Sequence, residues 1–366
     1  MKISIITVSY NSAKTIEQTI KSVISQSHRE VEYIIIDGGS TDGTIEIIEK
    51  YSKNIDFWVS EPDEGIYAAM NKGVKKATGD IVAFLNSDDW YVETALEIVN
   101  SYFFKDDIDI LMGWANMIAN DEVVALRKIN IESIFYSTPC CHQACFAKKS
   151  VFDEIGEFDL KYVICADHDW MLRAYNAGTK IKCVNDIFVN YRLGGESGKR
   201  IEKGAKEHKE IAYTNAICSG RQELIPLIEE QYEQKMKNYE IDSLLEQELE
   251  NDKDKLKQIL GLKDSYYIWG TGYYGWKCYE LFKKADINIV AFVDNSKKKK
   301  ELYGYPVISP DMISQTVNVC VATPKYEMEI VLQMEGIGIA PERYTTFTLM
   351  REKILRYTED DIKENL

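Results

Sequence analysis

Residues 86–89, with the sequence NSDD, form the part of the chain best suited to hold a divalent cation. They follow a continuous apolar run, residues 81–85, which is typical of a buried strand in a parallel sheet. Asp88 and Asp89 repel each other unless a cation lies beside them. Carboxylate oxygens suit Mg²⁺ or Mn²⁺, which usually share their coordination with substrate phosphates. The same two residues also fit a solvated loop that caps a helix starting near Val92.

Strands and helices alternate through the N-terminal part of the chain. The predicted strands are residues 3–8, 31–36, 57–59 and 81–85, and each is followed by a helical pattern of apolar residues. This alternation predicts an α/β fold with a mostly parallel sheet and right-handed crossovers. Because the loops after parallel strands open at one edge of the sheet, we expect polar residues from successive loops to converge on one crevice: Ser9, Asp37, Asp63 and Asp88.

The composition limits the class of protein. At 366 residues the chain is long enough for two domains. A net charge of −15 argues against a nucleic-acid partner, because neutralising phosphates requires clustered Lys and Arg. No apolar run approaches the roughly 18 residues of a membrane helix, and the sequence goes straight into a strand, so we expect a cytoplasmic protein that starts at or near Met1. Eight cysteines without paired spacing fit a reducing compartment. The oligomeric state does not follow from these totals.

Eight motifs occur in order along the first part of the sequence: ITVSYN, IIIDGGSTDGT, DEGIYAAMNKG, ATGDIVAFLNSDDW, HQACF, IGEFD, ADHDWMLR and YRLGGES. Together they resemble a family 2 glycosyltransferase with the GT-A fold. Within that family the chain is similar to the bacterial enzymes that build cell-surface polysaccharides. The resemblance covers roughly the first 200 residues.

The resemblance implies a metal site and a nucleotide-sugar site. It makes Asp89 the direct ligand of Mg²⁺ or Mn²⁺, with Asp88 near the ribose and the metal, so that charge developing on the leaving β-phosphate is neutralised. Tyr10 is available to stack on the base, and simple packing at a strand end explains it equally well. The residues that the resemblance assigns to the nucleotide-sugar donor are Thr7, Val8, Ser9, Tyr10, Asp37, Gly65, Lys72, Ser87, Asp88, Gly194, Gly195 and Ser197.

Asp37 lies at the end of the second predicted strand, where a carboxylate can accept from the imide N–H of uracil or from a ribose hydroxyl. Many relatives carry two acidic residues at this turn, and the second often contacts the base. This chain has Gly38 at that position. This departure leaves the donor nucleotide open: a UDP-sugar is the default expectation, with dTDP-sugars and GDP-sugars as alternatives.

A second carboxylate is needed to accept the proton of the acceptor hydroxyl. Residues 166–173 (ADHDWMLR) supply Asp167 and Asp169 at a predicted helix start, where the helix dipole favours the ionised form that a base requires. The resemblance implies Asp167 as the base, with Asp169 and Arg173 as supporting groups. Both acids also fit the role of ordinary helix-start residues. A base opposite the leaving group gives a single displacement with inversion, and no covalent nucleophile is required.

Two further segments bear on the site. In residues 139–146 (PCCHQACF) the adjacent cysteines lack the two-residue gap of a zinc knuckle, so we do not expect a zinc site. The resemblance instead places His142 and Gln143 in the wall near the acceptor. In residues 191–197 (YRLGGES) the glycines predict either a mobile loop that closes over the diphosphate or an ordinary exit from the domain.

The second half of the chain predicts a helical linker and a smaller α/β module. Residues 204–262 are rich in Glu, Lys and Gln, with apolar residues at helical spacing, and predict helices that pack on the catalytic domain or on a partner. A short strand then leads into Gly270, Gly272 and Gly275, and Asp294 follows 19 residues later. This spacing meets the sequence test for a Rossmann fingerprint and so predicts a second nucleotide site.

The predicted boundaries are 1–203 for the GT-A domain, 204–262 for the helical linker, 263–350 for a small Rossmann-like module and 351–366 for a C-terminal tail. Within the module we see no residue pair suited to moving a hydride or a proton, so binding, assembly or a structural role is favoured over redox catalysis. The lysines at 297–300 predict a solvated turn, with a phosphate contact as the alternative.

These observations favour an inverting, metal-dependent hexosyltransferase. It would move a sugar from a nucleotide sugar, expected to be a UDP-sugar, to a saccharide acceptor during synthesis of cell-surface polysaccharide or lipopolysaccharide. The family implies an acceptor of the lipid-linked kind and leaves open a peripheral contact with the inner face of the cytoplasmic membrane. The alternatives are an NAD(P)-linked enzyme centred on the glycine-rich module and a noncatalytic assembly protein.

Overall fold

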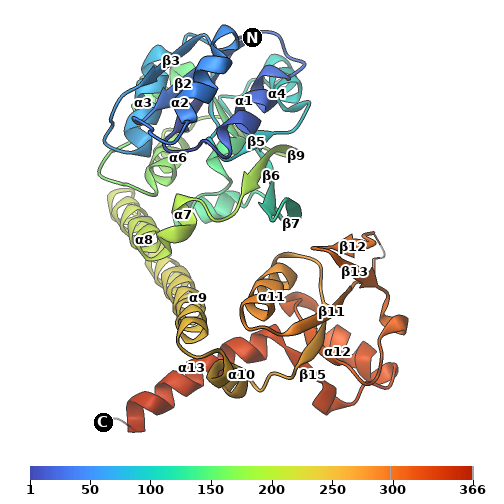
Figure 1. The fold of residues 1–366 in the computed structure, drawn as a ribbon. Coiled ribbons are helices and arrows are strands. Elements are labelled where there is room, and N and C mark those ends of the chain that lie inside the picture. The colour runs from blue at the N-terminus through green and yellow to red at the C-terminus, as the bar shows by residue number, and fades with distance from the viewer. Residues whose placement is uncertain (297, 365–366) are drawn as a thin grey trace. The chain divides into compact units, whose positions relative to one another are not determined.

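The computed structural model describes residues 1–296 and 298–364, with side chains through Tyr357. Lys297, the first lysine of the predicted solvated turn, lies outside the described residues. The chain divides into two compact units, drawn in Figure 1. Unit 1 comprises Met1–Ile118 and Leu126–Gln234, and unit 2 comprises Ala119–Ala125 and the chain from Lys235 onward. Among the described residues, none of the helices combines the length and the hydrophobicity of a membrane span.

Nine strands make up the first sheet. They are β1 Ile3–Ser9, β2 Val31–Asp37, β3 Phe57–Ser60, β4 Ile81–Phe84, β5 Trp90–Tyr91, β6 Ile110–Ala119, β7 Glu122–Arg127, β8 Cys145–Lys148 and β9 Ile181–Arg192. The helices that accompany them are α1 Ile16–Ile24, α2 Thr44–Lys50, α3 Ile66–Lys76, α4 Ala95–Lys105, α5 Lys149–Ile155, α6 Ala166–Asn176, α7 Glu196–Lys199 and α8 Ile201–Cys218. Short 3-10 helices are η1 Ser52–Asn54, η2 Ile131–Phe135, η3 His142–Ala144 and η4 Gln222–Leu224.

The strand order of this sheet is β3-β2-β1-β4-β8-β6-β9-β5, with β7 paired to β6. Strands β1 to β4 run parallel to one another, as the alternation of strands and helices predicted. Strand β8 is antiparallel to both of its neighbours, β4 and β6. The sheet is therefore mixed, and β8 carries the segment around His142 to the end of β4.

Helices cover both faces of the sheet because its central strands are apolar on both sides. In β1, Ile3 and Ile5 belong to the hydrophobic core on one face, which α1, α2 and α4 cover. Ile6 and Val8 belong to the core on the other face, which α3, α5 and α6 cover. This three-layer arrangement is the expected α/β architecture, and it leaves the strand ends as the place where polar residues collect.

Gly79 lies between α3 and β4. Helix α3 ends at Lys76 and Ala77 is the residue that caps it, so Gly79 is not the helix cap. A Cβ at position 79 would lie 2.6 Å from Ser4 Oγ and 2.8 Å from the Lys2 carbonyl oxygen. Glycine is required there because the chain passes very close to the start of β1.

Unit 2 contains a second sheet. Its strands are β10 Ser265–Trp269, β11 Asn288–Val293, β12 Glu301–Leu302, β13 Tyr305–Ile308, β14 Asn318–Val321 and β15 Tyr344–Thr346, in the order β12-β13-β11-β10-β14-β15. All pairs are parallel except β12 with β13. Its helices are α10 Lys253–Leu260, α11 Tyr273–Lys284, α12 Glu327–Gly336 and α13 Phe347–Glu364, with 3-10 helices η5 Pro310–Met312, η6 Pro324–Tyr326 and η7 Pro341–Arg343.

The predicted linker and tail are helices that pack into the two cores. Helix α8 contributes Ile211 to the core of unit 1. Helix α9, Ile225–Asn251, contributes Ile241 and Leu245 to the core of unit 2, together with α10. Helix α13 begins before the predicted tail and buries Met350 and Ile354 in the same core.

Candidate active site

The loops that follow β1, β2 and β4 are joined by hydrogen bonds at one edge of the sheet. Ser9 Oγ donates to Asp37 Oδ1 (2.8 Å), which links the ends of β1 and β2. The hydroxyls of Ser12 and Ser87 lie 2.7 Å apart and link the loop after β1 to the loop after β4. The predicted convergence of these loops is therefore present in the structure.

Asp37 is buried and organises this edge from within. Its carboxylate accepts from the hydroxyls of Ser9, Ser40 and Ser60 and from the backbone N–H groups of Gly39 and Ser40, all at 2.6–3.1 Å. Burial acts to raise the pKa of Asp37, but these hydrogen bonds outweigh it and the pKa is lowered. The direct contact with a base or ribose that the sequence suggested is unavailable here, because both oxygens are already occupied.

The loop after β1 presents one side chain outward. Thr7 and Val8 are buried, and the Thr7 hydroxyl lies 3.2 Å from the Tyr33 hydroxyl in the interior. Their side chains therefore cannot contact a nucleotide, because successive residues of β1 point into the helical layers on opposite faces of the sheet. Tyr10 is 67% exposed. It is held by a turn in which the backbone N–H of Asn11 donates to Ser40 Oγ (2.7 Å).

Asp88 and Asp89 follow β4 but face different surroundings. Asp89 is 1% exposed, and its carboxylate accepts from Gln143 Nε2 (2.6 Å) and from the Arg192 backbone N–H (2.8 Å). Asp88 is half-buried, and a Cβ placed on Gly195 would lie 3.1 Å from its Oδ2. The sequence put Asp89 first as the metal ligand, whereas in this conformation Asp88 is the more open carboxylate.

The electrostatics of this pair fit a cation. Burial raises the pKa of Asp89 well above its usual value, and the negative charge of Asp88 raises it further. Burial also raises the pKa of Asp88. Gln143 Oε1, beside Asp89, is a buried oxygen without a hydrogen-bond partner. Within the described part of the chain no group of three or more His, Cys, Asp or Glu residues is placed to hold a metal alone. Two carboxylates that share a cation with substrate phosphates are the usual arrangement for Mg²⁺.

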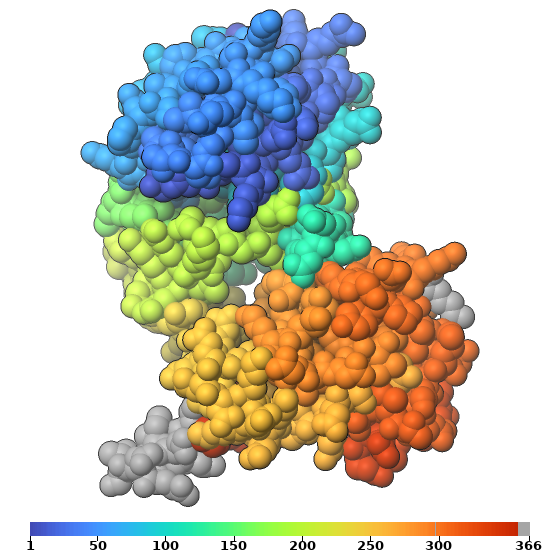
Figure 2. Space-filling view, in the orientation of Figure 1, coloured from blue at the N-terminus to red at the C-terminus, as the bar shows by residue number. Residues whose placement is uncertain are grey.

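The end of β9 lies against Asp88 and adds a residue that the sequence analysis did not assign to the site, Arg192. Arg192 donates from Nε to the Asp88 carbonyl oxygen (3.3 Å), and its guanidinium lies 5.0 Å from the centre of the Trp90 ring. On the face shown in Figure 2, the blue surface of the first residues lies next to yellow-green surface near residue 200. The hydrogen bond from Arg192 Nη2 to Gln18 Oε1 (2.9 Å) joins α1 to the end of β9.

The predicted glycine loop follows Arg192 directly. Gly194 has a φ of 93°, a conformation that favours glycine, and Ser197 Oγ lies 3.0 Å from the Tyr191 hydroxyl. Gly195 precedes the short helix α7, next to Asp88. Gly195 therefore lies beside the Asp88 carboxylate, and the donor role of the three residues stays a prediction.

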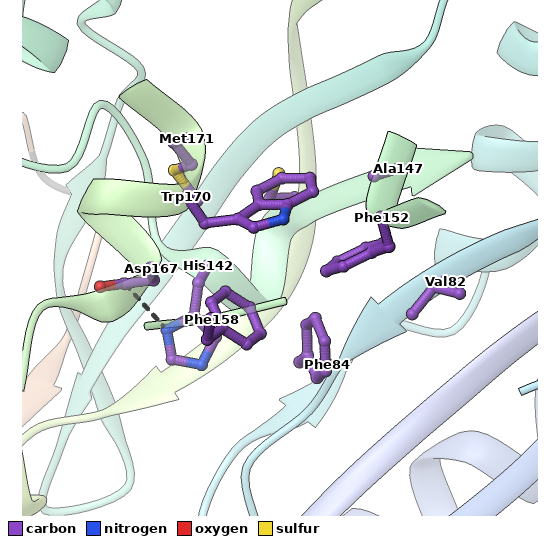
Figure 3. A pocket seen from close by; sticks show the side chains of 10 residues that line it. Val82, Phe84, His142, Ala147, Phe152, Phe158, Asp167, Trp170 and Met171 are labelled. Atoms are coloured by element: carbon purple, nitrogen blue, oxygen red, sulfur yellow. Dashed lines mark ion pairs between the residues drawn. The ribbon is translucent and has the colours of Figure 1, made fainter. Parts of the chain in front are cut away.

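Asp167, the predicted base, lies in the first turn of α6 and is 9% exposed. Its Oδ1 accepts from the Tyr67 hydroxyl (3.0 Å) and from the His168 backbone N–H (2.9 Å), while Oδ2 lies 3.4 Å from His142 Nδ1, the dashed line in Figure 3. Burial acts to raise the pKa of Asp167, but the hydrogen bond and charge of His142 outweigh it and the pKa is lowered. The carboxylate is thus held ionised, with Oδ2 the less occupied oxygen.

An apolar cavity of about 20 Å³ lies behind this group, with room for roughly one water molecule. Figure 3 shows the aromatic side chains of Phe84, Phe152, Phe158 and Trp170 around it. These rings pack against one another, with the Phe152 and Trp170 rings stacked at 4.4 Å between centres. They exclude water from one side of Asp167, which explains why burial opposes its ionisation.

His142 and Gln143 connect the two acidic centres. They are successive residues of η3, and they contact Asp167 and Asp89 respectively. His142 Nε2 also lies 3.4 Å from Asn86 Oδ1. Gln143 is 1% exposed and so supports Asp89 rather than forming an open wall near the acceptor. No local pattern signals this contact, because it depends on β8 inserting beside β4.

Other predicted residues lie farther from these contacts. Asp169 accepts from Arg173 Nε (2.8 Å), and Arg173 also donates to the carbonyl oxygens of Ile155 (2.7 Å) and Glu157 (2.8 Å). This pair therefore fastens α6 to the turn before it. The remaining two predicted residues belong to α3 and its start: Gly65 has a φ of 115°, and Lys72 pairs with Glu61 (2.9 Å).

The neighbouring cysteines of this segment face different layers. Cys140 and Cys145 belong to the core on the α3 and α6 face of the sheet, and Cys141 belongs to the opposite core. Their side chains thus serve as packing groups on the two sides of β8.

In unit 2 the glycine-rich turn connects β10 to α11. A Cβ on Gly275 would lie 2.1 Å from the Gly270 carbonyl oxygen, so only glycine permits this close approach. Asp294 follows β11 and accepts from the Thr271 hydroxyl and from the Ser296 backbone N–H (2.6 Å). Its carboxylate therefore holds the turn itself. Gly272 is the N-cap residue of α11 and immediately precedes it.

Comparison with known proteins agrees with the fold of unit 1. The family model for glycosyl transferase family 2 matches residues 4–173, and a model described as C2185-like, N-terminal, matches residues 262–344. The chain is 33% identical over 178 residues to an uncharacterized glycosyltransferase of Mycobacterium tuberculosis, a match that covers 47% of this chain and 68% of that protein. It is 27% identical over 206 residues to a PGL/p-HBAD biosynthesis glycosyltransferase of Mycobacterium bovis, covering 55% and 80% of the two chains.

A similar solved structure is S. aureus TarS 1–349 in complex with UDP-GlcNAc, with a TM-score of 0.51 at 22% sequence identity. The match covers 59% of this chain and 66% of that one, just under two-thirds of its length. This likeness shows the fold. The mixed α/β architecture of unit 1 is thus that of the GT-A class. The chain belongs to the family 2 glycosyl transferases.

Proposed function

We propose that this protein is an inverting, metal-dependent glycosyltransferase that uses a nucleotide sugar, with UDP as the nucleotide, and a saccharide acceptor. The observation that carries the proposal is the contact of His142 and Gln143 with the two acidic centres. Asp89 is held by Gln143, and Asp167 lies beside His142, so one turn of chain fixes both groups. Sugar transfer needs this combination, a site for a leaving diphosphate and a base for the acceptor hydroxyl.

In the reaction, the acceptor hydroxyl oxygen attacks the anomeric carbon of the donor sugar. Asp167 Oδ2 accepts the hydroxyl proton as the new glycosidic bond forms. The bond between the anomeric carbon and the β-phosphate oxygen breaks, and the electron pair leaves with the nucleoside diphosphate. One displacement inverts the anomeric centre. Tyr67 and the His168 N–H hold Oδ1, which keeps Oδ2 directed toward the acceptor.

The residues that would hold Mg²⁺ or Mn²⁺ are Asp88 and Asp89. A bound cation supplies Lewis-acid neutralisation of the charge on the leaving diphosphate. Gln143 and the Arg192 N–H orient Asp89. Gly194, Gly195 and Ser197 would supply backbone and hydroxyl donors to the phosphates, and the support for this is that Gly195 lies next to Asp88.

We assign the product to cell-surface polysaccharide synthesis at the inner face of the cytoplasmic membrane. The support for this is the resemblance in sequence and the presence of a PGL/p-HBAD biosynthesis glycosyltransferase among the similar proteins. A lipid-linked saccharide is the acceptor class that this assignment implies.

The proposal is tested by screening the purified chain against UDP-, dTDP- and GDP-sugars with Mn²⁺ and measuring release of the nucleoside diphosphate. We expect release from at least one donor, abolished in Asp167→Asn and retained in Asp153→Asn. Asp153 is a matched control because it lies on α5 of the same unit and its side chain is 66% exposed. The proposal would be contradicted if the chain neither bound any of these donors nor released a nucleoside diphosphate from them.

For unit 2 we propose a binding or assembly role in place of NAD(P)-linked catalysis. Asp294, which would bind a ribose in a dinucleotide site, is engaged by Thr271 and Ser296. Titration with NADH and NADPH, followed by cofactor fluorescence, should give no saturable binding. Binding that Gly272→Ala abolishes would support the NAD(P) alternative.

A further inference from the structure

We propose that Asp63 reads the nucleobase of the donor in this chain, in place of the acidic residue that is absent at position 38. The inference rests on the proposed function, because it assumes a nucleoside diphosphate in the crevice beside Tyr10. It gives a role to Asp63, which the sequence placed at the converging loops without assigning it to the nucleotide sugar. It also assigns a class of base: one that carries a single imide N–H, which is uracil or thymine.

The first observation is the position of the Asp63 carboxylate. A Cβ built on Gly38 would lie 3.1 Å from Asp63 Oδ2 and 3.5 Å from Tyr10 Cδ2. The carboxylate of Asp63 therefore occupies the space that a side chain at 38 would enter. It reaches that space from the loop after β3, and the absence of a side chain on Gly38 is what admits it.

The second observation is that the neighbouring acid is committed elsewhere. Asp37 accepts five hydrogen bonds from its own turn and from Ser9 and Ser60, and it is 0% exposed. Asp63 is half-buried, and its Oδ1 accepts from the Gly65 backbone N–H (2.8 Å). Its Oδ2 accepts no hydrogen bond and joins no ion pair with any residue in the described ranges 1–296 and 298–364.

The number of free oxygens discriminates between bases. Uracil and thymine present one N–H between two carbonyl groups. They therefore match a carboxylate that has one free oxygen and whose second oxygen is occupied by a backbone N–H. Guanine presents two parallel N–H donors and is matched best by two free oxygens. With Oδ1 occupied by Gly65, Asp63 suits the single imide donor.

Tyr10 supplies the second element of a base site. Its ring is 67% exposed, and the loop that carries it is fixed by hydrogen bonds from Asn11 N–H to Ser40 Oγ (2.7 Å) and from Thr41 N–H to Asn11 Oδ1 (3.0 Å). A large exposed aromatic ring on a hydrogen-bonded loop, next to a free carboxylate oxygen, offers both the stacking face and the edge contact that a base needs.

The test is calorimetric binding of nucleoside diphosphates to the full-length chain with Mn²⁺. The probes are UDP, dTDP, GDP and 3-methyluridine diphosphate, which lacks the imide proton. We expect the wild type to bind UDP or dTDP about tenfold to a hundredfold more tightly than the methylated probe and GDP, as for a hydrogen bond to a charged group. In Asp63→Ala the affinity for UDP should no longer exceed the affinity for 3-methyluridine diphosphate.

A compensating variant separates base reading from a merely structural role. In Gly38→Asp/Asp63→Ala the new carboxylate enters the space vacated by Asp63, and the preference for UDP over the methylated probe should return. Glu64→Ala, an exposed acid beside Asp63, is the control and should keep the wild-type ratio.

An unchanged ratio in Asp63→Ala, or a wild-type preference for GDP, would overturn this inference while leaving glycosyl transfer intact. Failure of the wild type to bind any of the four nucleotides would instead overturn the proposed function.

Discussion

At the scale of single residues, His142 favours the ionised form of Asp167, the proposed base. The pKa of Asp167 is lowered although burial acts to raise it, because the hydrogen bond and charge of His142 offset the burial. In His142→Phe the burial remains and only the hydrogen bonds from Tyr67 and the His168 N–H oppose it, so we expect the acid limb of the kcat/KM profile to move to higher pH. His142→Gln keeps a donor and should move it less. A pH profile that is identical in the wild type and in His142→Phe would contradict this reading.

The same contact has a consequence for stability. The folded-state pKa of Asp167 is below the unfolded value of about 3.9, so the ionised form contributes stability above that pH. This contribution is lost as the pH falls through the folded-state pKa. In His142→Phe the folded-state pKa is raised, and acid unfolding should therefore begin at higher pH.

Gln143 orients Asp89 through a 2.6 Å hydrogen bond inside the protein. Gln143→Leu removes this donor at nearly constant volume. Loss of a hydrogen-bond partner of a metal-binding carboxylate typically lowers metal affinity or activity by about 10–100-fold. We therefore expect Gln143→Leu to need about 10–100-fold more Mn²⁺ for half-maximal donor hydrolysis. Gln222→Leu, in η4 and far from Asp89 in the chain, should leave that dependence unchanged. An equal Mn²⁺ requirement in Gln143→Leu and the wild type would show that Asp89 is positioned without Gln143.

The sequence allowed the polar residues to be named but not their orientations. Apolar strands followed by polar residues predict that Ser9, Asp37 and Asp88 meet at one edge, since parallel strands leave no other arrangement. Whether Asp88 or Asp89 faces outward depends on Gln143 and the Arg192 N–H, which reach Asp89 from distant parts of the chain. Such contacts have no periodic signal in the sequence.

At the scale of elements, α6 is fixed by Arg173. Its guanidinium bonds Asp169 on the same helix and the carbonyl oxygens of Ile155 and Glu157 in the preceding turn. Arg173→Ala should lower the free energy of unfolding by about 1–3 kcal/mol, because charged hydrogen bonds to backbone oxygens are lost. Urea denaturation measures this change.

The control for this prediction is Lys149→Ala. Lys149 pairs with Asp153 at the surface of α5, and the two side chains are 31% and 66% exposed. An exposed pair of this kind is worth at most about 0.5 kcal/mol. If Arg173→Ala and Lys149→Ala lowered the free energy of unfolding equally, Arg173 would contribute no more to stability than a surface charge.

Element boundaries were predictable where strands are apolar on both faces and less so in the charged helices. The run before Asp37 gives β2 directly, since residues 33–36 pack alternately on the two helical layers. Helix α9 lacks a strong apolar stripe, and its last turns enter the core of unit 2 through Ile241, Leu245 and Leu249. The partner of such a helix is decided by tertiary packing, so its division between the units could not be predicted.

At the scale of the whole molecule, each unit has its own hydrophobic core, so we expect two unfolding transitions. A Cβ on Gly275 would lie 2.1 Å from the Gly270 carbonyl oxygen, and overpacking of this kind costs about 1–3 kcal/mol. Gly275→Ala should therefore lower the midpoint of one transition only, as measured by calorimetry.

Gly336→Ala is the matched control, because a Cβ at that position has no atom within 4 Å apart from its chain neighbours and the backbone of its own helix. It should leave both midpoints nearly unchanged. At temperatures below its lowered unfolding midpoint, the Gly275→Ala variant should retain donor hydrolysis, since the acids proposed for catalysis belong to unit 1. Loss of hydrolysis in the folded Gly275→Ala variant would place essential chemistry in unit 2.

The central claim is that Asp88 and Asp167 serve one reaction in separate roles, one toward the leaving diphosphate and the other toward the acceptor. Measuring Mn²⁺-dependent UDP binding and donor turnover on the same samples of wild type, Asp88→Asn and Asp167→Asn tests it most directly. We predict that Asp88→Asn loses both binding and turnover, whereas Asp167→Asn binds UDP as the wild type does and loses turnover. Wild-type turnover in either variant, or loss of UDP binding in Asp167→Asn, would contradict it.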